Sequence, residues 1–263
     1  MKKVSVRRDR VRDLERIDHA LSEASSVLAG YTPGFIDATR KTGGDPVTEA
    51  DEKVDELLRE LLPEPGEGWL SEETADSPER LAASRVWVVD PLDGTREFVE
   101  GIPEWCVSIG LVENGVAVAG GITNLVMDQR VVGSLATGVT LNGEPAAVRL
   151  IERIEGAEVL ASRSEVRRGE WDQFQDGPIL VRPMGSVAYK MALVAAGLAD
   201  ATWTLTPKNE WDVAAGTALV SAAGGLVTYP DGSIPTFNNP DPLIPGLVAV
   251  PRGIATAVKG LIG

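Results

Sequence analysis

Apolar residues recur at helical spacing near the start of the chain. Leu14, Ile17, Leu21 and Leu28 fall on one face of a helix, which predicts a first helix from about residue 9 to residue 29. A polar, glycine-bearing loop is predicted over residues 40–46. It leads to a second helix, whose apolar face is formed by Ala50, Val54, Leu57, Leu58 and Leu61. The segment Thr48-Glu49-Ala50-Asp51 resembles a capping box at its start, and this alone gives Asp51 a structural role.

Strand-like patterns dominate the middle of the chain. Residues 85–89 form a β-branched and aromatic run that is typical of a buried strand. Two further runs, residues 107–111 and 116–123, are joined by Asn114-Gly115, which is a strong hairpin signal. Residues 131–136 continue this antiparallel meander. An N-terminal α+β subdomain is therefore expected over residues 1–148.

The remaining residues alternate between short strands and helices. Strands are predicted at 158–162, 180–182, 201–205, 226–229 and 247–250. Helices are predicted near Ser164, over 185–198, over 212–223 and from about Ile254. This alternation predicts a layered α/β subdomain over residues 149–263.

Composition narrows the classes of protein that fit this pattern. The 263 residues are 43% hydrophobic and 24% charged, which is enough for one large domain or two that share a cleft. The net charge of −14 argues against binding of a nucleic-acid polymer. No apolar stretch is long enough to span a membrane, and the basic N-terminus lacks the apolar core of a signal peptide. Cys106 is the one cysteine, so no intrachain disulfide can form, and a cytoplasmic location is expected.

The segment Asp90-Pro91-Leu92-Asp93-Gly94-Thr95 places two carboxylates at the predicted end of the buried strand. Two such charges repel unless a cation lies between them, and a hard divalent cation suits carboxylate oxygens. Gly94 and Thr95 lie where a helix is expected to begin, and free N–H groups there can bind an anion. Metal-assisted phosphate chemistry is one interpretation, and an ordinary turn between a strand and a helix is the other.

Further acidic residues lie at the ends of other predicted elements. They are Asp51, Glu72 or Glu73, and Asp212. Each has a plain structural explanation by itself: a helix cap, a loop charge or a helix N-terminus. The only histidine, His19, lies in the first predicted helix, where a surface role is expected. Cys106 lies in an apolar run and is expected to be a core residue.

Taken together, these segments resemble the motifs of the inositol monophosphatase superfamily. The matching segments, in order, are Val47 to Asp51, Ser71-Glu72-Glu73-Thr74, Asp90 to Thr95, and Trp211-Asp212-Val213-Ala214-Ala215-Gly216. The resemblance covers nearly the whole chain. It implies a layered αβαβα sandwich of the inositol monophosphatase and fructose-1,6-bisphosphatase type, of the α/β (α+β) class. It also implies a lithium-sensitive, magnesium-dependent phosphatase.

The resemblance assigns roles residue by residue. Glu72, Asp90 and the Leu92 carbonyl would hold one Mg²⁺, and Asp90, Asp93 and Asp212 would hold a second. Asp51 and Thr95 would orient or deprotonate the attacking water, around a third ion if one is used, with Glu72 also counted as catalytic. The backbone of Gly94 and Thr95 would receive the phosphate, beside Asp93 and Asp212. One departure is Ser71, because the family commonly has Gly-Glu-Glu where this chain has Ser71-Glu72-Glu73.

The substrate is indicated less directly. Inositol monophosphatases tend to carry a sugar-binding glutamate near the position that Thr204 occupies here. The segments around Arg163, Ser186, Lys190 and Lys208 instead resemble the 3′(2′),5′-bisphosphate nucleotidase branch, and these four residues could bind a second phosphate. A solvent-facing position for Lys190 and a loop charge for Lys208 are the alternatives.

A bisphosphate nucleotidase is therefore the leading prediction. Inositol-1-monophosphatase or fructose-1,6-bisphosphatase is the alternative, and a catalytically weak protein that binds metal and phosphate is the alternative outside the enzymes. The expected partner is a small phosphorylated metabolite, with no membrane, and relatives suggest a homodimer.

Overall fold

Two large β-sheets alternate with three helical layers in the computed structural model. The model describes residues 2–40 and 46–263, and the side chains of residues 10–39 and 46–263. Residues 41–45 of the predicted polar loop lie outside the described residues. The larger sheet has seven strands in the order β3-β4-β5-β6-β7-β8-β9. These strands are β3 (Gly68–Ser71), β4 (Arg85–Asp93), β5 (Cys106–Glu113), β6 (Val116–Asn124), β7 (Gln129–Ser134), β8 (Gly138–Leu141) and β9 (Glu144–Ala146).

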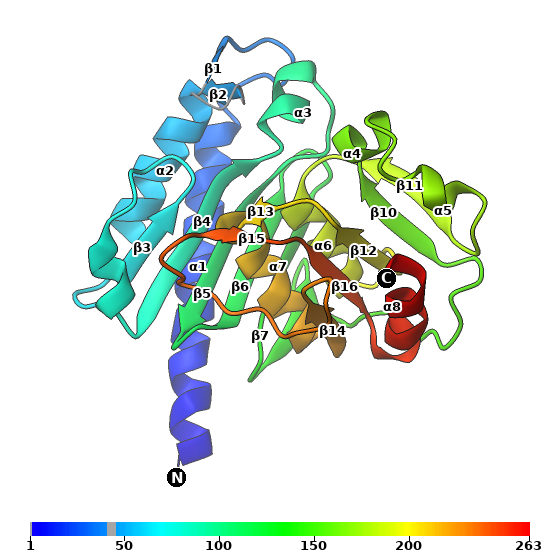
Figure 1. Ribbon diagram of the computed structural model, residues 1–263. Helices are drawn as coiled ribbons and strands as arrows, with labels where there is room; N and C mark the ends of the chain where they lie inside the picture. Colours follow the sequence, from blue (N-terminus) through cyan, green and yellow to red (C-terminus); the bar gives the residue numbers. More distant parts are fainter. Residues whose placement is uncertain (1, 41–45) are drawn as a thin grey trace.

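Two long helices, α1 (Lys2–Leu28) and α2 (Glu49–Leu61), cover one face of this sheet (Figure 1). A short hairpin of β1 (Ala38–Arg40) and β2 (Pro46–Thr48) connects them. The alternation of side chains along a strand explains the packing, because Trp87 and Val89 of β4 face these helices while Val86 and Val88 face the opposite layer. The capping box predicted at Thr48 is present, since the side chain of Asp51 accepts from the Thr48 backbone and that of Thr48 bonds to the first turn of α2.

Helices α6 (Val187–Ala195) and α7 (Glu210–Ala222) lie between the two sheets. The second sheet has the order β11-β10-β12-β16-β14. Its strands are β10 (Glu158–Ser162), β11 (Leu180–Met184), β12 (Ala201–Thr204), β14 (Gly225–Thr228) and β16 (Leu247–Pro251). A small pair, β13 (Lys208–Asn209) and β15 (Leu243–Ile244), joins antiparallel just before α7.

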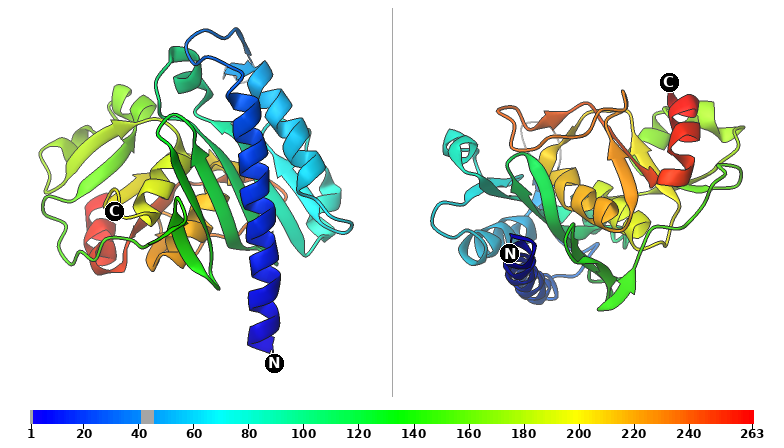
Figure 2. Two further views of the ribbon diagram at one scale, coloured as in Figure 1. Left: turned by 180° about the vertical axis from the view of Figure 1, so that it is seen from behind. Right: turned by 90° about the horizontal axis from the view of Figure 1, so that it is seen from below.

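Shorter helices complete the outer layer over the second sheet (Figure 2). They are α4 (Arg163–Arg167), α5 (Asp172–Gln175) and α8 (Ala255–Ile262), the last preceded directly by the short helix η2 (Arg252–Ile254). Elsewhere, η1 (Pro78–Ala82) precedes β4 and α3 (Thr95–Glu100) follows it. A cluster of Trp171, Phe174 and Trp203 packs this layer, with Trp171 stacked on Trp203 at 5.2 Å between ring centroids. The order of layers is helix, sheet, helix, sheet, helix, so the predicted αβαβα sandwich is confirmed.

Several predicted elements differ in detail. The β4 ladder does not end at Asp90 but continues to Asp93, and α7 begins at Glu210, two residues before Asp212. Strand β3 was not predicted, because its four residues follow a passage rich in proline and glycine. The division into subdomains at residue 148 stays a prediction. Among the described residues, no helix is both long enough and apolar enough to cross a bilayer.

Candidate active site

The end of β4 is distorted in a way that brings two carboxylates to one side. Asp90 pairs with Ser108 of β5 and Asp93 pairs with Cys106, so three steps along β4 match two steps along β5. A regular strand would turn residues three apart to opposite faces, but the extra residue of this bulge changes the alternation. Asp90 and Asp93 consequently line the same cavity.

The N-terminus of α7 approaches this strand end from the opposite layer. Two glycines of the sheet allow the approach, because a Cβ on Gly110 or Gly120 would lie only 2.9 Å from the Ala215 nitrogen or 2.7 Å from its carbonyl oxygen. Ala214 and Ala215 thus form the flat face of a helix that packs closely on the sheet, while Gly216 lies against Met191 of α6. This packing carries Asp212, in the first turn of α7, toward β4.

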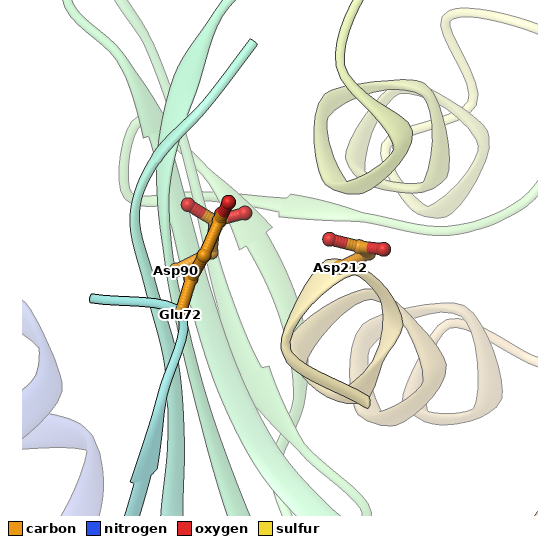
Figure 3. Close-up of side chains that lie close together, drawn as sticks. All are labelled: Glu72, Asp90 and Asp212. Carbon is orange, nitrogen blue, oxygen red and sulfur yellow. The ribbon is translucent and has the colours of Figure 1, made fainter. Parts of the chain in front are cut away.

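Glu72, Asp90 and Asp212 form the centre of the site (Figure 3). Each offers one carboxylate oxygen, and these oxygens all lie within 4.8 Å of one another. Figure 3 shows Glu72 and Asp90 side by side at the sheet, with Asp212 facing them from the start of α7. Three or more acidic, histidine or cysteine side chains can hold a metal ion where their ligand atoms lie close together. Among the described residues, Glu72, Asp90 and Asp212 form such a group.

The carboxyl groups disfavour one another's charge. Burial raises the pKa of Asp90 well above its ordinary value, and the neighbouring charges of Glu72, Asp93 and Asp212 raise it further. Burial and the charges of Asp93 and Glu72 raise the pKa of Asp212 to about 8. A bound cation would remove this repulsion, and carboxylate oxygens are the ligands that Mg²⁺ prefers. The residues present therefore fit a magnesium site.

Asp93 is held by the loop before α6. Its Oδ2 accepts hydrogen bonds from the Ser186 hydroxyl at 2.7 Å and from the Ala188 nitrogen at 2.6 Å. These bonds lower the pKa of Asp93, but burial outweighs them and the net direction is upward. Ser186 also caps α6, accepting from the Tyr189 nitrogen at 3.0 Å. Ser186 thus both lines the cavity and holds Asp93 in place.

Asp51 and Thr95 lie together at the edge of the site. The Thr95 hydroxyl is 2.9 Å from Asp51 Oδ1 and 3.0 Å from the Leu92 carbonyl oxygen, so its single proton can be donated to either. Burial raises the pKa of Asp51. Gly94, which directly precedes Thr95, has a φ of +101°, and a Cβ at this position would lie 2.8 Å from the Glu104 carbonyl oxygen. Only glycine fits this turn without strain.

The cavity has a volume of about 350 Å³ and is lined by residues of both halves of the chain. All but one of the predicted site residues line this cavity. They are Glu72, Asp90, Leu92, Asp93, Gly94, Thr95, Arg163, Ser186, Lys190, Lys208 and Asp212. Asp51 lies behind this lining and reaches it through Thr95. His19 is exposed in α1, and Cys106 is buried, as expected for a core residue.

The predicted cations differ in their surroundings. The solvent-facing alternative for Lys190 is wrong, since Lys190 is only 2% exposed. Its ammonium donates to the Ser186 carbonyl at 2.9 Å, and burial lowers its pKa to about 8. Arg163 pairs with Glu104, and Lys208 pairs with Glu165 at 3.1 Å.

Sequence patterns did not identify several residues around the cavity. Arg96, Glu97 and Arg168 line it, and Glu104 and Glu165 anchor the cations from behind. Burial raises the pKa of Glu97, which lies against Gly185 so closely that a Cβ there would meet its carboxyl carbon at 2.4 Å. Arg96 and Glu97 directly follow the Asp90–Thr95 motif, and that adjacency is a usable signal. Glu104 and Glu165 have no comparable signal in the sequence.

Comparison with known proteins agrees with this geometry. The sequence model of the Inositol monophosphatase family matches residues 12–261. The chain is 32% identical to the inositol-1-monophosphatase of Mesorhizobium japonicum over 237 residues, which are 85% of this chain and 86% of that protein. It is 30% identical over 204 residues to a Thermotoga maritima protein named fructose-1,6-bisphosphatase/inositol-1-monophosphatase, covering 74% and 76% of the two chains.

Solved structures give the same result. The inositol monophosphatase of Thermotoga maritima superimposes with a TM-score of 0.80 at 27% identity, over 93% of this chain and 94% of that chain. The enzyme from Anabaena gives a TM-score of 0.78 at 28% identity, over 95% and 93%. The fold and the match across nearly the whole chain define a phosphomonoesterase. The chain belongs to the inositol monophosphatase family, whose members are magnesium-dependent. The names of these relatives favour the inositol monophosphatase alternative over the predicted bisphosphate nucleotidase.

Proposed function

We propose that the chain is a Mg²⁺-dependent phosphatase that hydrolyses inositol 1-phosphate or a closely related polyol monophosphate. The observation that carries the proposal is the set of Glu72, Asp90 and Asp212 oxygens within 4.8 Å of one another beside an open cavity. The names of the relatives supply the substrate class.

The ligand assignment follows the prediction from the motifs. Glu72, Asp90 and the Leu92 carbonyl would hold one ion, and Asp90, Asp93 and Asp212 would hold a second. When bound, such ions supply Lewis acidity and a water of lowered pKa. Asp93 would have Oδ1 available for an ion, because Oδ2 accepts hydrogen bonds from Ser186 and Ala188.

Asp51 and Thr95 would handle the proton of the attacking water. The Thr95 oxygen can accept a hydrogen bond from water while its own proton points to Asp51 Oδ1, 2.9 Å away. The raised pKa of Asp51 makes its carboxylate a better proton acceptor than an exposed aspartate. The backbone N–H groups of Gly94 and Thr95, at the start of α3, would bind the phosphate oxygens.

The far wall of the cavity supports a monophosphate as the lead substrate. Three of its cations already have carboxylate partners: Arg163 pairs with Glu104, Lys208 with Glu165, and Arg168 with Glu170 at 2.5 Å. The fourth, Lys190, donates to the Ser186 carbonyl at 2.9 Å. A second phosphate would have to compete with these carboxylates for the same donors. The free energy gained from a second phosphate is therefore expected to be small.

The same wall still favours one second candidate. Arg163, Arg168, Lys190 and Lys208 all line this cavity, which is the composition expected for a bisphosphate, either a sugar bisphosphate or a 3′,5′-bisphosphate nucleotide. Thr204, at the position where inositol-specific relatives tend to have glutamate, donates to Glu165 at 2.5 Å and gives no replacement for that carboxylate.

The test is phosphate release from three esters with Mg²⁺: inositol 1-phosphate, fructose 1,6-bisphosphate and adenosine 3′,5′-bisphosphate, each with and without Li⁺. We expect the highest kcat/KM with inositol 1-phosphate and inhibition by Li⁺. A clear preference for the nucleotide would restore the bisphosphate nucleotidase prediction. Release from none of them, with Mg²⁺ bound, would favour a binding protein. The homodimer stays a prediction that sedimentation velocity can test.

A further inference from the structure

Asp55 lies one helical turn after Asp51 on α2 and has no part in the chemistry described so far. Residues four apart lie on the same face of a helix, so both carboxylates point from α2 toward the large sheet. Asp51 reaches Thr95 at the active site. Asp55 is 6% exposed, and its two oxygens accept hydrogen bonds from the Ser71 and Thr74 hydroxyls, one on each oxygen.

These two hydroxyls flank Glu72 in the sequence. The Glu72 nitrogen is itself bonded to the Val89 carbonyl of β4 at 3.3 Å. The backbone around Glu72 is thus held by β4 from one side and by Asp55 from the other. The Trp69 indole adds a contact to the Thr74 hydroxyl at 3.4 Å.

We propose that Asp55 is a positioning residue that sets the place of the Glu72 carboxylate in the metal site. The proposal rests on the function proposed above, because it takes Glu72 to be a ligand. Metal ligands must be held close to their productive geometry, and hydrogen-bonded partners behind the ligands contribute to metal affinity. Through Asp51 and Asp55, one rigid helix fixes both the proton-accepting group and a ligand loop.

This role also gives a reason for the departure at Ser71. The family commonly has glycine there, which offers no side-chain donor. Ser71 supplies the hydroxyl that occupies Asp55 Oδ1, while Thr74 occupies Oδ2. Both carboxylate oxygens of Asp55 are then satisfied, which a buried charge requires.

The experiment compares Mg²⁺ binding by calorimetry, without substrate, for the wild type and for Asp55→Ala, Ser71→Ala and Glu56→Ala. Glu56 is the matched control, because it is the next residue on α2 and is exposed. We expect the Mg²⁺ Kd to rise about tenfold for Asp55→Ala, the lower end of the effect of an outer partner. A smaller rise is expected for Ser71→Ala, and none for Glu56→Ala. At saturating Mg²⁺ the KM for substrate should stay within about twofold of the wild type.

A merely structural role would lower Tm and leave the Mg²⁺ affinity of the folded protein unchanged, and that result would overturn the proposal. If Asp55→Ala does not fold, Ser71→Ala and Asp55→Asn decide the question by the same titration. Failure of the proposed function looks different: the wild type would bind Mg²⁺ but hydrolyse no inositol 1-phosphate, while the variants would still show the graded loss of affinity. A wild type that binds no Mg²⁺ would overturn both.

Discussion

Strand β4 has carboxylates at both ends, and the two groups differ in what faces them. At its start, Arg85 pairs with Asp13 at 2.6 Å, with Glu67 at 2.8 Å, and with Glu113. At its end, Asp90 faces the charges of Glu72, Asp93 and Asp212. The first group is an ion-pair cluster, whereas in the second the carboxylates lie mainly against one another, with Lys190 and Lys208 only partly offsetting their charge.

The pKa values show the consequence. Burial alone would raise the pKa of Glu67, but hydrogen bonds from Arg16, Trp87 and Arg85 bring it down to about 2. Burial and like charges raise the pKa of Asp212 to about 8. The carboxylate that stabilises the fold has a lowered pKa because cations surround it, whereas Asp212 has a raised pKa because neighbouring carboxylates outweigh the cations near it, and a bound cation would relieve that repulsion.

The largest effect is expected from Asp93→Asn. This change keeps the size of the side chain and can keep an acceptor for Ser186 and Ala188, but it removes a charge from the second metal position. Turnover should fall about 10³-fold, the upper end for one preorganised electrostatic partner. Phosphate release from inositol 1-phosphate measures this loss, and circular dichroism checks the fold. Near-normal turnover would contradict the assignment of two ions.

At the other end of β4, Glu67→Ala should affect stability and not turnover. The Glu67 side chain is 8% exposed and accepts bonds from Arg16 at 2.7 Å and from Trp87 at 2.8 Å. Removing it takes one carboxylate partner from Arg16, one from Arg85 and the acceptor from the Trp87 indole, which costs about 3 kcal/mol of unfolding free energy. Urea unfolding measures the change. An equal loss of kcat/KM in the folded variant would show that the two ends of β4 are not independent.

The two ends should also respond oppositely to pH in protein treated with a chelator. Glu67 has a lowered pKa, so its contribution is present above its ordinary value of 4.5 and is lost as the pH falls toward about 2. Asp212 has a raised pKa, so stability is greatest below its ordinary value of 3.8 and is lost as the pH rises through about 8. Tm measured across this range should therefore fall at both extremes. Glu67→Gln should flatten the acid side, Asp212→Asn the alkaline side, and added Mg²⁺ should restore stability near pH 8.

The same contrast explains what the sequence could reveal. The site acids sit in short motifs whose local chemistry is readable, such as the turn predicted at Pro91 and the helix start predicted at Asp212, and the order of motifs indicates the family. The bulge that continues β4 to Asp93 was not readable, because it depends on the pairing with β5. The ion-pair cluster has no motif, because Asp13, Arg85 and Glu113 come from α1, β4 and β5, and Glu67 comes from the loop before β3. Glu104 and Glu165 were missed for the same reason, since their roles depend on which loops meet across the cavity. Strand β3 was missed because its pairing with β4, and not its own short sequence, makes it a strand.

The smallest effect is expected for Arg12→Ala, which removes an exposed cation at the edge of the ion-pair cluster, where Glu64 lies between Arg12 and the Arg16 partner of Glu67. Arg12 and Glu64 lie 2.5 Å apart, but their side chains are 67% and 42% exposed. Water and salt screen such a pair, so the loss should be below about 0.5 kcal/mol and should vanish in 1 M salt, where the Debye length is about 3 Å. Urea unfolding at low and high salt, run beside Glu67→Ala, measures both. If Arg12→Ala lost as much unfolding free energy as Glu67→Ala, burial would not explain which ion pairs of this cluster stabilise the fold.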